Sequence, residues 1–374
     1  MKKTIYLGYY CNNSENKSVS PAGNTMMDYV ISVLEKNTNQ LIVVSPAQEN
    51  KNTERKSVDF RKRTEIYLPS YRNYNIFLRL LDKIKRKVDL YKELMNILDN
   101  GDNLIVYHSL AYIDVLKKIR KKKDINLILQ VCEIYADVLE DKKLKNKEIN
   151  WIQTADKFVF STKELEKMLN VNKKEYTVCM GMYRYNAKKY IPQFNDDLIH
   201  IVYAGTFDSR KGVMEAIHAG EYLNENYHLH ILGFGSDEEV SIIKKLISDV
   251  LKKCQCKITY DGLKTGDDYI DFIKSCDIGL SPQNVITAFN DTSFPSKILS
   301  YMSNGLRVVS VEIPVIKNSS VGKYLYFYKN QDPKEIAQVI MNIDLNDGNN
   351  SKKIIDNLDC NFYNDLKNLL RCKE

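Results

Sequence analysis

Short apolar runs and longer amphipathic stretches alternate along this chain. Residues 4–10, 41–45 and 104–107 are apolar runs with the length and composition of buried strands. Between such runs, apolar residues recur at helical spacing, most clearly over residues 74–98. Strands that alternate with helices favour parallel sheets with helices on both faces, so the pattern predicts an α/β protein.

The second half of the chain repeats this strand–loop–helix order. It begins with a strand over residues 198–204, a loop over 205–212 and a helix over 213–223. Further strands are expected at residues 228–232, 257–260 and 277–281. The polar stretch 184–197 is the expected linker, because 374 residues are enough for two domains.

One loop of the second half places two cations beside glycines. The loop over 205–212 begins with Gly205 and Thr206 and contains Arg210 and Lys211 before its last glycine. Arginine can chelate two oxygens and lysine supplies a compact charge, so the pair suits a diphosphate. A solvated turn is the alternative interpretation.

A second anion-binding feature lies within residues 290–312. Pro295 is predicted as the first residue of a helix, with Ser293 or Ser296 as its cap. Lys297 follows one turn into the helix. Free helix amides, the helix dipole and an ammonium group together favour a negatively charged ligand, although an ordinary loop–helix–strand unit would show the same pattern.

Glycines also follow two later strands, where they allow a ligand to approach the backbone. Gly233, Phe234 and Gly235 come after the strand over 228–232. Gly262 and Leu263 come after the strand over 257–260. These positions are candidates for close contacts between the backbone and a ligand.

In the first half, a polar loop over residues 11–24 joins the first strand to the first helix. It ends with Ala22, Gly23 and Asn24, where the glycine lets a ligand approach the backbone closely. The loop is not a Gly-x-Gly-x-x-Gly fingerprint, so a nicotinamide or flavin site is not supported.

His108 and Glu133 are the acid–base candidates of the first half. Each follows directly after a predicted strand, and ligands of parallel sheets bind at the carboxyl ends of strands. A structural role is the alternative for His108. Glu133 stands among apolar residues. A carboxylate is unfavourable in such surroundings unless it has a polar partner, so its presence there suggests a specific role.

Neither a metal nor a cofactor is predicted. His228 and His230 share one face of a strand, but the sequence shows no third ligand beside them and no Asp-x-Asp pair stands out. The eight Cys form no Cys-x-x-Cys pair, which favours reduced thiols and a cytoplasmic protein. No apolar run is long enough to span a membrane, and the amino terminus does not resemble a signal peptide.

Basic residues are concentrated in the first half. Residues 1–190 carry a net charge of +12 and residues 191–374 a net charge of −5. The runs 117–123 and 142–147 are basic, and so is the polar face of the helix over 74–98. This face is either a membrane-surface element or a solvated face of a packed helix, and the charge overall points to an anionic partner.

The chain resembles GT-B glycosyltransferases of family 4, also called group 1. Residues 301–309 show the pattern aromatic-Met-x-x-Gly-x-x-Val-Val of their donor-binding block. The preceding Phe-Pro-Ser-Lys is similar to a branch found in polysaccharide biosynthesis clusters. In register with the two Glu residues of the family, this chain has Thr292 and Ser300.

The resemblance implies two Rossmann-like domains that face a cleft, and a role for each candidate. The expected diphosphate-binding residues are Gly205, Thr206, Arg210, Lys211, Pro295, Ser296 and Lys297. The expected nucleoside-binding residues are Gly233, Phe234, Gly235, Gly262, Leu263 and Ser300. In the family that the chain resembles, the loop that ends here with Ala22, Gly23 and Asn24 faces the acceptor and the donor phosphates. Asp291 joins His108 and Glu133 as a catalytic candidate, in place of the absent Glu. The expected domains are residues 1–190 and 191–345, with a helix over 346–374 that returns to the first.

The implied activity is transfer of a hexose-type sugar from a nucleoside diphosphate sugar, with UDP as the expected nucleotide. The acceptor would be a saccharide or lipid-linked molecule of bacterial capsule, O-antigen or exopolysaccharide assembly, and the reaction would be retaining and metal-independent. Two alternatives remain open at this point. One is a sugar-nucleotide epimerase of the same fold, and the other is a protein that binds nucleic acid or another anionic surface through its basic half. We expect no nucleic acid partner, because no recognition motif is present.

Overall fold

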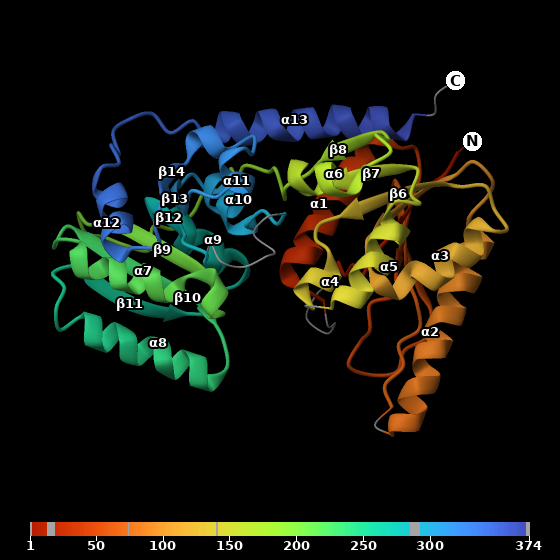
Figure 1. The fold of residues 1–374 in the computed structure, drawn as a ribbon, viewed down its shortest axis with the longest axis horizontal. Helices are drawn as coiled ribbons and strands as arrows, with labels where there is room; N and C mark the ends of the chain where they lie inside the picture. The colour runs from red at the N-terminus through yellow and green to blue at the C-terminus, as the bar shows by residue number, and fades with distance from the viewer. Residues whose placement is uncertain (1, 13–18, 74, 140, 285–291, 372–374) are drawn as a thin grey trace. The chain divides into compact units, whose positions relative to one another are not determined.

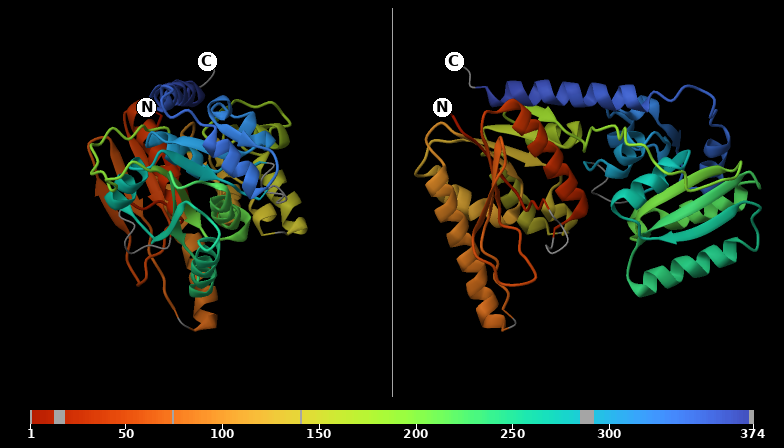
Figure 2. Two further views of the ribbon diagram at one scale, coloured as in Figure 1. Left: turned by 90° about the vertical axis from the view of Figure 1, so that its left-hand side faces the viewer. Right: turned by 180° about the vertical axis from the view of Figure 1, so that it is seen from behind.

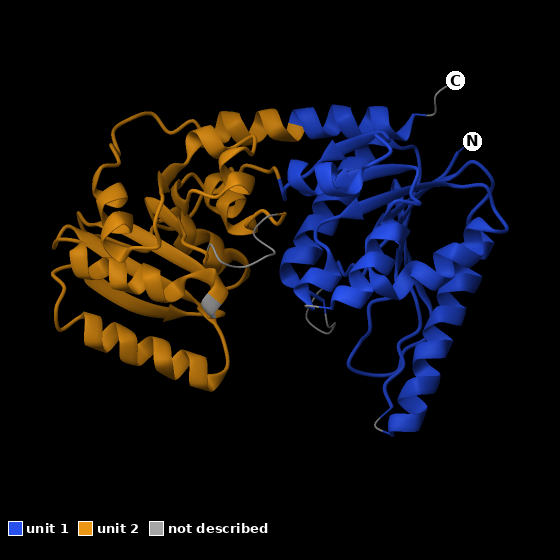
Figure 3. Cartoon of the chain, viewed as in Figure 1, with its two compact units in different colours: residues 1–182, 360–374 blue, residues 183–359 orange. Residues whose placement is uncertain are grey.

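The computed structural model describes residues 2–12, 19–73, 75–139, 141–284 and 292–371. The chain forms two compact units (Figure 3). Unit 1 comprises Met1–Met182 together with Cys360–Glu374, and unit 2 comprises Tyr183–Asp359. Each unit is built on its own largely parallel sheet, so the predicted α/β class with two Rossmann-like domains is confirmed (Figures 1 and 2).

Unit 1 contains a sheet in the order β3-β4-β2-β1-β5-β6-β7-β8 across its described residues. The strands are β1 (Thr4–Leu7), β2 (Leu41–Ser45), β3 (Lys56–Asp59), β4 (Arg63–Tyr67), β5 (Asn103–Tyr107), β6 (Asn126–Val131), β7 (Lys157–Phe160) and β8 (Tyr176–Val178). All neighbours pair in parallel except β3 with β4. The central strands are fully buried, as expected for a sheet covered on both faces.

The helices of unit 1 connect these strands. They are α1 (Pro21–Asn37), α2 (Ile76–Ile97), α3 (Ile113–Arg120), α4 (Tyr135–Val138), α5 (Lys142–Ile152) and α6 (Lys163–Leu169). The helix that the spacing predicts over 74–98 is α2, which Asn75 caps by accepting a hydrogen bond from the amide of Phe77.

Helix α13 (Ser351–Leu370) ends on unit 1. Phe362 stacks on Tyr29 with ring centroids 5.7 Å apart. Lys157 Nζ donates to the carbonyl oxygen of Leu369 at 2.7 Å, and Asn103 Nδ2 donates to that of Leu370 at 3.3 Å. These side chains satisfy carbonyls that have no partner within the helix, so they fix where α13 ends.

Unit 2 is a parallel sheet in the order β11-β10-β9-β12-β13-β14. Its strands are β9 (Ile199–Thr206), β10 (Tyr227–Phe234), β11 (Lys257–Gly262), β12 (Ile278–Ser281), β13 (Arg307–Val311) and β14 (Tyr326–Tyr328). Its helices are α7 (Val213–Ala219), α8 (Asp237–Val250), α9 (Gly266–Lys274), α10 (Ser296–Ser303), α11 (Pro314–Lys317) and α12 (Pro333–Met341). The strand order reverses direction at β9, and such a switch point is where open α/β sheets bind ligands.

Within the described residues, no helix is both long enough and apolar enough to cross a membrane.

Candidate functional site

The switch point of unit 2 opens between β9 and β12. These strands pair only at Ile278 with Ile201 and at Gly279 with Val202. Beyond that point the hydroxyl of Tyr301 joins them, because it accepts from the amide of Ala204 at 2.8 Å and donates to the carbonyl of Leu280 at 3.3 Å. The aromatic residue of the donor-block pattern therefore holds the first turns of α10 against the carboxyl end of β9.

Lys297 projects from α10 to the end of β9. Its Nζ lies 4.0 Å from the ring centroid of Tyr203, and a Cβ added to Gly205 would lie 3.2 Å from it. Nζ is buried and has no hydrogen-bond partner among the described residues. Burial, followed by the nearby charge of Lys211, lowers the pKa of Lys297 to about 7. A buried ammonium without a partner is unfavourable, so the arrangement is suited to an anion that would supply one.

The amino end of α10 is also open to a ligand. Pro295 is the N-cap, and none of the described side chains caps the helix. Our predictions that Pro295 is the first helical residue and that a serine caps the helix are therefore wrong. The extended conformation of Pro295 starts the helix one residue later, at Ser296. By contrast, Ser236 and Glu239 form a complete capping box on α8, which occupies the corresponding amides there.

Arg210 is engaged by a neighbour that the sequence analysis did not consider. Asp208 accepts hydrogen bonds from Arg210 Nη2 at 2.6 Å and from Nε at 3.0 Å. This pairing holds the pKa of the Asp208 carboxyl below its usual range. A diphosphate would have to compete with Asp208 for the guanidinium, whereas Lys297 has no such competitor within the described part of the chain. Asp208 and Arg210 are two positions apart in the sequence, and this short spacing could have predicted the pair.

Glycines are required at the carboxyl ends of the strands of unit 2, where the loops approach one another. Gly212 has φ +76°, and a Cβ there would lie 1.7 Å from the carbonyl oxygen of Pro282. A Cβ on Gly233 would lie 1.9 Å from the carbonyl oxygen of Gly205. No side chain fits at either position, so the glycines let the ends of β9, β10 and β12 converge.

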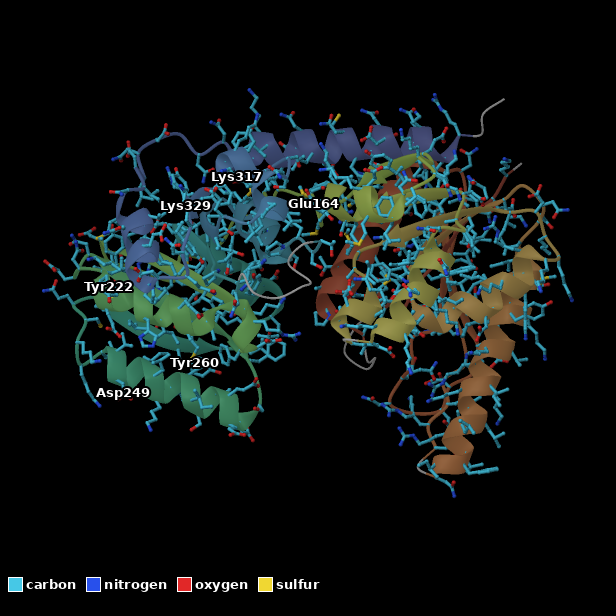
Figure 4. All side chains as sticks on the ribbon, in the orientation of Figure 1. Glu164, Tyr222, Asp249, Tyr260, Lys317 and Lys329 are labelled. Carbon is cyan, nitrogen blue, oxygen red and sulfur yellow. The ribbon has the colours of Figure 1, made fainter. Side chains whose placement is uncertain are left out.

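The expected nucleoside residues line the neighbouring strand ends. Phe234 and Leu263 are largely exposed, and Gly262 ends β11 in the left-handed region. The hydroxyl of Tyr260 donates to the carbonyl of Gly233 at 3.4 Å and so joins β11 to β10. Tyr260 is labelled in Figure 4. Gly235 packs against Glu239 of the capping box, which leaves it little room for a ligand.

The two positions that correspond to the family's Glu residues are both engaged. Thr292 is buried, and Ser300 Oγ lies 3.2 Å from the hydroxyl of Tyr269. A ribose at Ser300 would share that hydroxyl with Tyr269.

In unit 1, His108 belongs to a buried polar cluster. Its Nε2 lies 2.8 Å from Glu148 Oε1, and its Nδ1 has no partner among the described residues. Glu148 also accepts from the amides of Tyr135 and Ala136, at 2.9 and 2.8 Å. The carboxylate thus holds the histidine ring and the first turn of α4 together. The sequence analysis missed Glu148, because its α5 location does not reveal that it faces β5.

The structure gives less information on the other two catalytic candidates, Glu133 and Asp291. Glu133 is half-buried beyond the end of β6, in contact with neighbouring groups. Asp291 lies outside the described residues.

The predicted loop over residues 11–24 is wrong at its end. Helix α1 already begins at Pro21, so Ala22, Gly23 and Asn24 form its first turn. Ser20 caps the helix by accepting from the amide of Gly23 at 3.3 Å. The side chain of Asn24 exchanges two hydrogen bonds with the backbone of Cys11, both at 2.9 Å. Proline at the start of the helix and these bonds explain the earlier start.

Comparison with known proteins agrees with this architecture. Residues 199–344 match a family described as "Glycosyl transferases group 1". The trehalose-6-phosphate synthase OtsA has a TM-score of 0.72 at 9% identity, over 100% of both chains. A sucrose-phosphate synthase from Thermosynechococcus elongatus has a TM-score of 0.69 at 12% identity, over 98% of both chains.

A third structure, described as trehalose-6-phosphate from E. coli bound with UDP-2-fluoro glucose, has a TM-score of 0.70 at 11% identity over 100% of both chains. No curated protein matches the sequence of this chain. The likeness to solved structures shows the GT-B fold, and the match of unit 2 to the group 1 family supports a glycosyltransferase.

Proposed function

We propose that this protein transfers a hexose-type sugar from a nucleoside diphosphate sugar, with UDP as the nucleotide, to a saccharide or lipid-linked acceptor. The observation that carries the proposal is the buried ammonium of Lys297, which lacks a hydrogen-bond partner among the described residues. It lies beside Gly205 at the switch point, where α10 also has no side-chain cap. The group 1 family match covers this region, and the fold is shared with a structure bound to UDP-2-fluoro glucose.

The chemistry follows from the charge that develops during transfer. The bond between the sugar C1 and the diphosphate oxygen breaks, and the acceptor hydroxyl oxygen bonds to C1 and loses its proton. Negative charge grows on the departing diphosphate, so Lys297 and the amides of α10 stabilise it where it forms. Lys211 adds positive charge nearby, and Arg210 joins if it exchanges Asp208 for a phosphate oxygen.

We also propose that the reaction retains configuration and needs neither metal nor cofactor. We further propose a role in capsule, O-antigen or exopolysaccharide assembly. The Phe-Pro-Ser-Lys segment, which is similar to enzymes of polysaccharide clusters, supports the last of these. His108, Glu133 and Asp291 stay the catalytic candidates of this proposal.

The first test is calorimetric titration of UDP, and of GDP for comparison, into the full chain. We expect micromolar UDP binding and weaker GDP binding. Incubation with UDP-hexoses and lipid-linked acceptors should then give a glycosylated acceptor and free UDP, whereas an epimerase would return an altered UDP-sugar. Failure of both nucleotides to bind would contradict the proposal.

The exposed surface of helix α2 supports the proposal that the acceptor lies at an anionic membrane surface. The apolar stripe of its amino-terminal half is uncovered: the exposed fractions are 83% for Ile76, 71% for Phe77, 59% for Leu80 and 56% for Ile84. Arg79, Lys83, Lys85 and Lys87 are exposed on the same stretch. Exposed apolar residues with flanking basic residues are typical of a helix that binds anionic lipid in the interface. Figure 1 shows α2 extending beyond the sheet of unit 1.

We therefore expect the protein to sediment with vesicles that contain anionic lipid, and less so at high salt. Replacing Phe77 and Leu80 together by Ser should weaken this binding by at least about tenfold, because burying each such side chain contributes roughly 1.5–3 kcal/mol. Ile242→Ser removes an exposed apolar residue of α8 and is the matched control. Equal binding of both variants, or equal binding to neutral vesicles, would argue against a membrane role for α2.

A further inference from the structure

Three histidines converge at the amino ends of the strands of unit 2. His200 of β9 is the register partner of His228 of β10, and His230 follows on the same face. Their ligand nitrogens all lie within 4.8 Å of one another. Along the sequence only His228 and His230 stand close together, and for this reason no metal was predicted. The third histidine comes from the neighbouring strand, a relation that only the parallel pairing of β9 with β10 reveals.

Carboxylates hold the outer nitrogens of two of these rings. Asp196 Oδ1 lies 2.9 Å from His200 Nε2, and Asp261 Oδ2 lies 3.1 Å from His230 Nδ1. A carboxylate accepts a hydrogen bond, so each pairing keeps the proton on the outer nitrogen. The same arrangement, in which a carboxylate orients a histidine from behind, is usual for histidines that bind metals.

The inner nitrogens then face each other without a proton to share. His200 Nδ1 and His230 Nε2 are 2.9 Å apart, and both carry lone pairs in the tautomers that the carboxylates select. Two lone pairs at that distance repel unless a positively charged species stands between or beside them. Either one additional proton or a metal cation meets this requirement.

His228 favours the metal, because it adds a third neutral ligand. Its Nε2 lies 3.1 Å from the hydroxyl of Thr259, which donates in turn to Asp261 at 2.8 Å. His228 Nε2–H is therefore the donor to Thr259, and its Nδ1 keeps a lone pair.

We propose that His200, His228 and His230 bind one divalent transition-metal ion, and that zinc suits this donor set best. Three imidazoles with a fourth position for water are a known tetrahedral zinc arrangement, and imidazole also suits nickel and copper. The rings of His228 and His230 lie over each other with centroids 3.8 Å apart, so His228 would have to turn as well as approach to direct its lone pair at the ion. Metal–nitrogen distances of about 2.0–2.1 Å also require the 2.9 Å nitrogen pair to open slightly. His228 is partly buried, whereas His200 and His230 are buried.

The proposed ion would hold the amino ends of the strands together, away from the proposed donor site. Phe194 stacks on His200 with ring centroids 3.9 Å apart, so the ion would fasten residues 194–196 to the sheet. His200 stands at the start of β9, and Gly205 near its end is about 17 Å away at the usual rise of a strand. The site is therefore separate from the proposed donor site, and its test does not depend on the proposed function.

The experiment uses the full chain, stripped with a chelator and then equilibrated with Zn²⁺ or Co²⁺. We expect one equivalent of Zn²⁺, measured by elemental analysis, together with a rise in the thermal unfolding temperature. Co²⁺ should give the visible absorption of a tetrahedral site without a thiolate charge-transfer band, which separates the histidines from the cysteines. This measurement needs no variant, so it stands even if a buried histidine proves essential for folding.

Two variants and one control complete the test. His228→Asn should weaken Zn²⁺ binding by at least tenfold, and Asp261→Asn should weaken it by roughly 10–100-fold, as expected for loss of a carboxylate behind a ligand. His218→Asn removes a partly exposed histidine of α7 that pairs with Glu221, and should bind Zn²⁺ like the wild type. Absence of stoichiometric metal, or unchanged binding in His228→Asn, would overturn the proposal and leave a shared proton between His200 and His230.

Discussion

Replacement of Lys297 by Met is expected to weaken UDP binding by at least tenfold, about 1.4 kcal/mol, and at the same time to stabilise the free protein. The ammonium is buried against Tyr203 and Gly205 and has no partner among the described residues. Methionine has a similar length and keeps the packing without the cost of a buried charge. Replacing buried charged groups by apolar ones is often stabilising by about 1–4 kcal/mol, and we expect a value near the lower end for one cation.

The two effects are measured by calorimetric UDP titration and by urea unfolding without nucleotide. Lys317→Met is the matched control, because Lys317 is an exposed lysine of the same unit that pairs with Glu312. It should leave UDP binding unchanged. If Lys297→Met destabilised the free protein and left UDP affinity intact, Lys297 would be a structural residue and not a phosphate-binding one.

The depressed pKa of Lys297 adds a pH signature to this prediction. The free protein holds Lys297 mostly neutral at pH 8, because its pKa is about 7. A bound diphosphate favours the charged form, so UDP binding at pH 8 should take up a proton, seen as a dependence of the binding enthalpy on the buffer. Between about pH 7 and 10.5 the unfolded state binds more protons at this lysine, so wild-type stability should gain from rising pH in that window. The Met variant should lack both effects.

Loss of Glu148 is expected to lower the free energy of unfolding by about 3–5 kcal/mol. Glu148→Ala removes the acceptor for the amides of Tyr135 and Ala136 and the partner of His108, all in a buried place. Each orphaned donor loses its hydrogen bond without gaining water. Glu148→Gln keeps the shape and one acceptor oxygen, so it should be milder.

Urea unfolding of both variants, beside Glu54→Ala as an exposed control in unit 1, gives the comparison. The Gln variant also reports on function, since it should retain the fold while it changes the hydrogen bonding of His108. If Glu148→Ala were as stable as the exposed control, the cluster would not hold α4 and β5 together in the way that its geometry indicates.

The local pattern of apolar and polar residues was sufficient to predict several helices and strands of this protein. The apolar spacing over residues 74–98 predicted α2, and the order of strands and glycine loops predicted the parallel sheet of unit 2. These features depend on which residues are neighbours along the chain, so periodicity records them directly. The donor-block pattern likewise placed Lys297 near the start of a helix, although its first residue is Ser296.

The sequence by itself determined the order of the helices and strands of unit 2, the two-domain α/β class and the positions of the glycine-containing loops of unit 2. Tertiary structure alone decided which polar groups meet. It buried Lys297 without a hydrogen-bond partner among the described residues, joined Glu148 to His108 across separate elements and brought His200 beside His228. The physical reason is that charge, burial and hydrogen bonding act through space, and the sequence separations of 40 and 28 residues in the last two pairs carry no periodic signal.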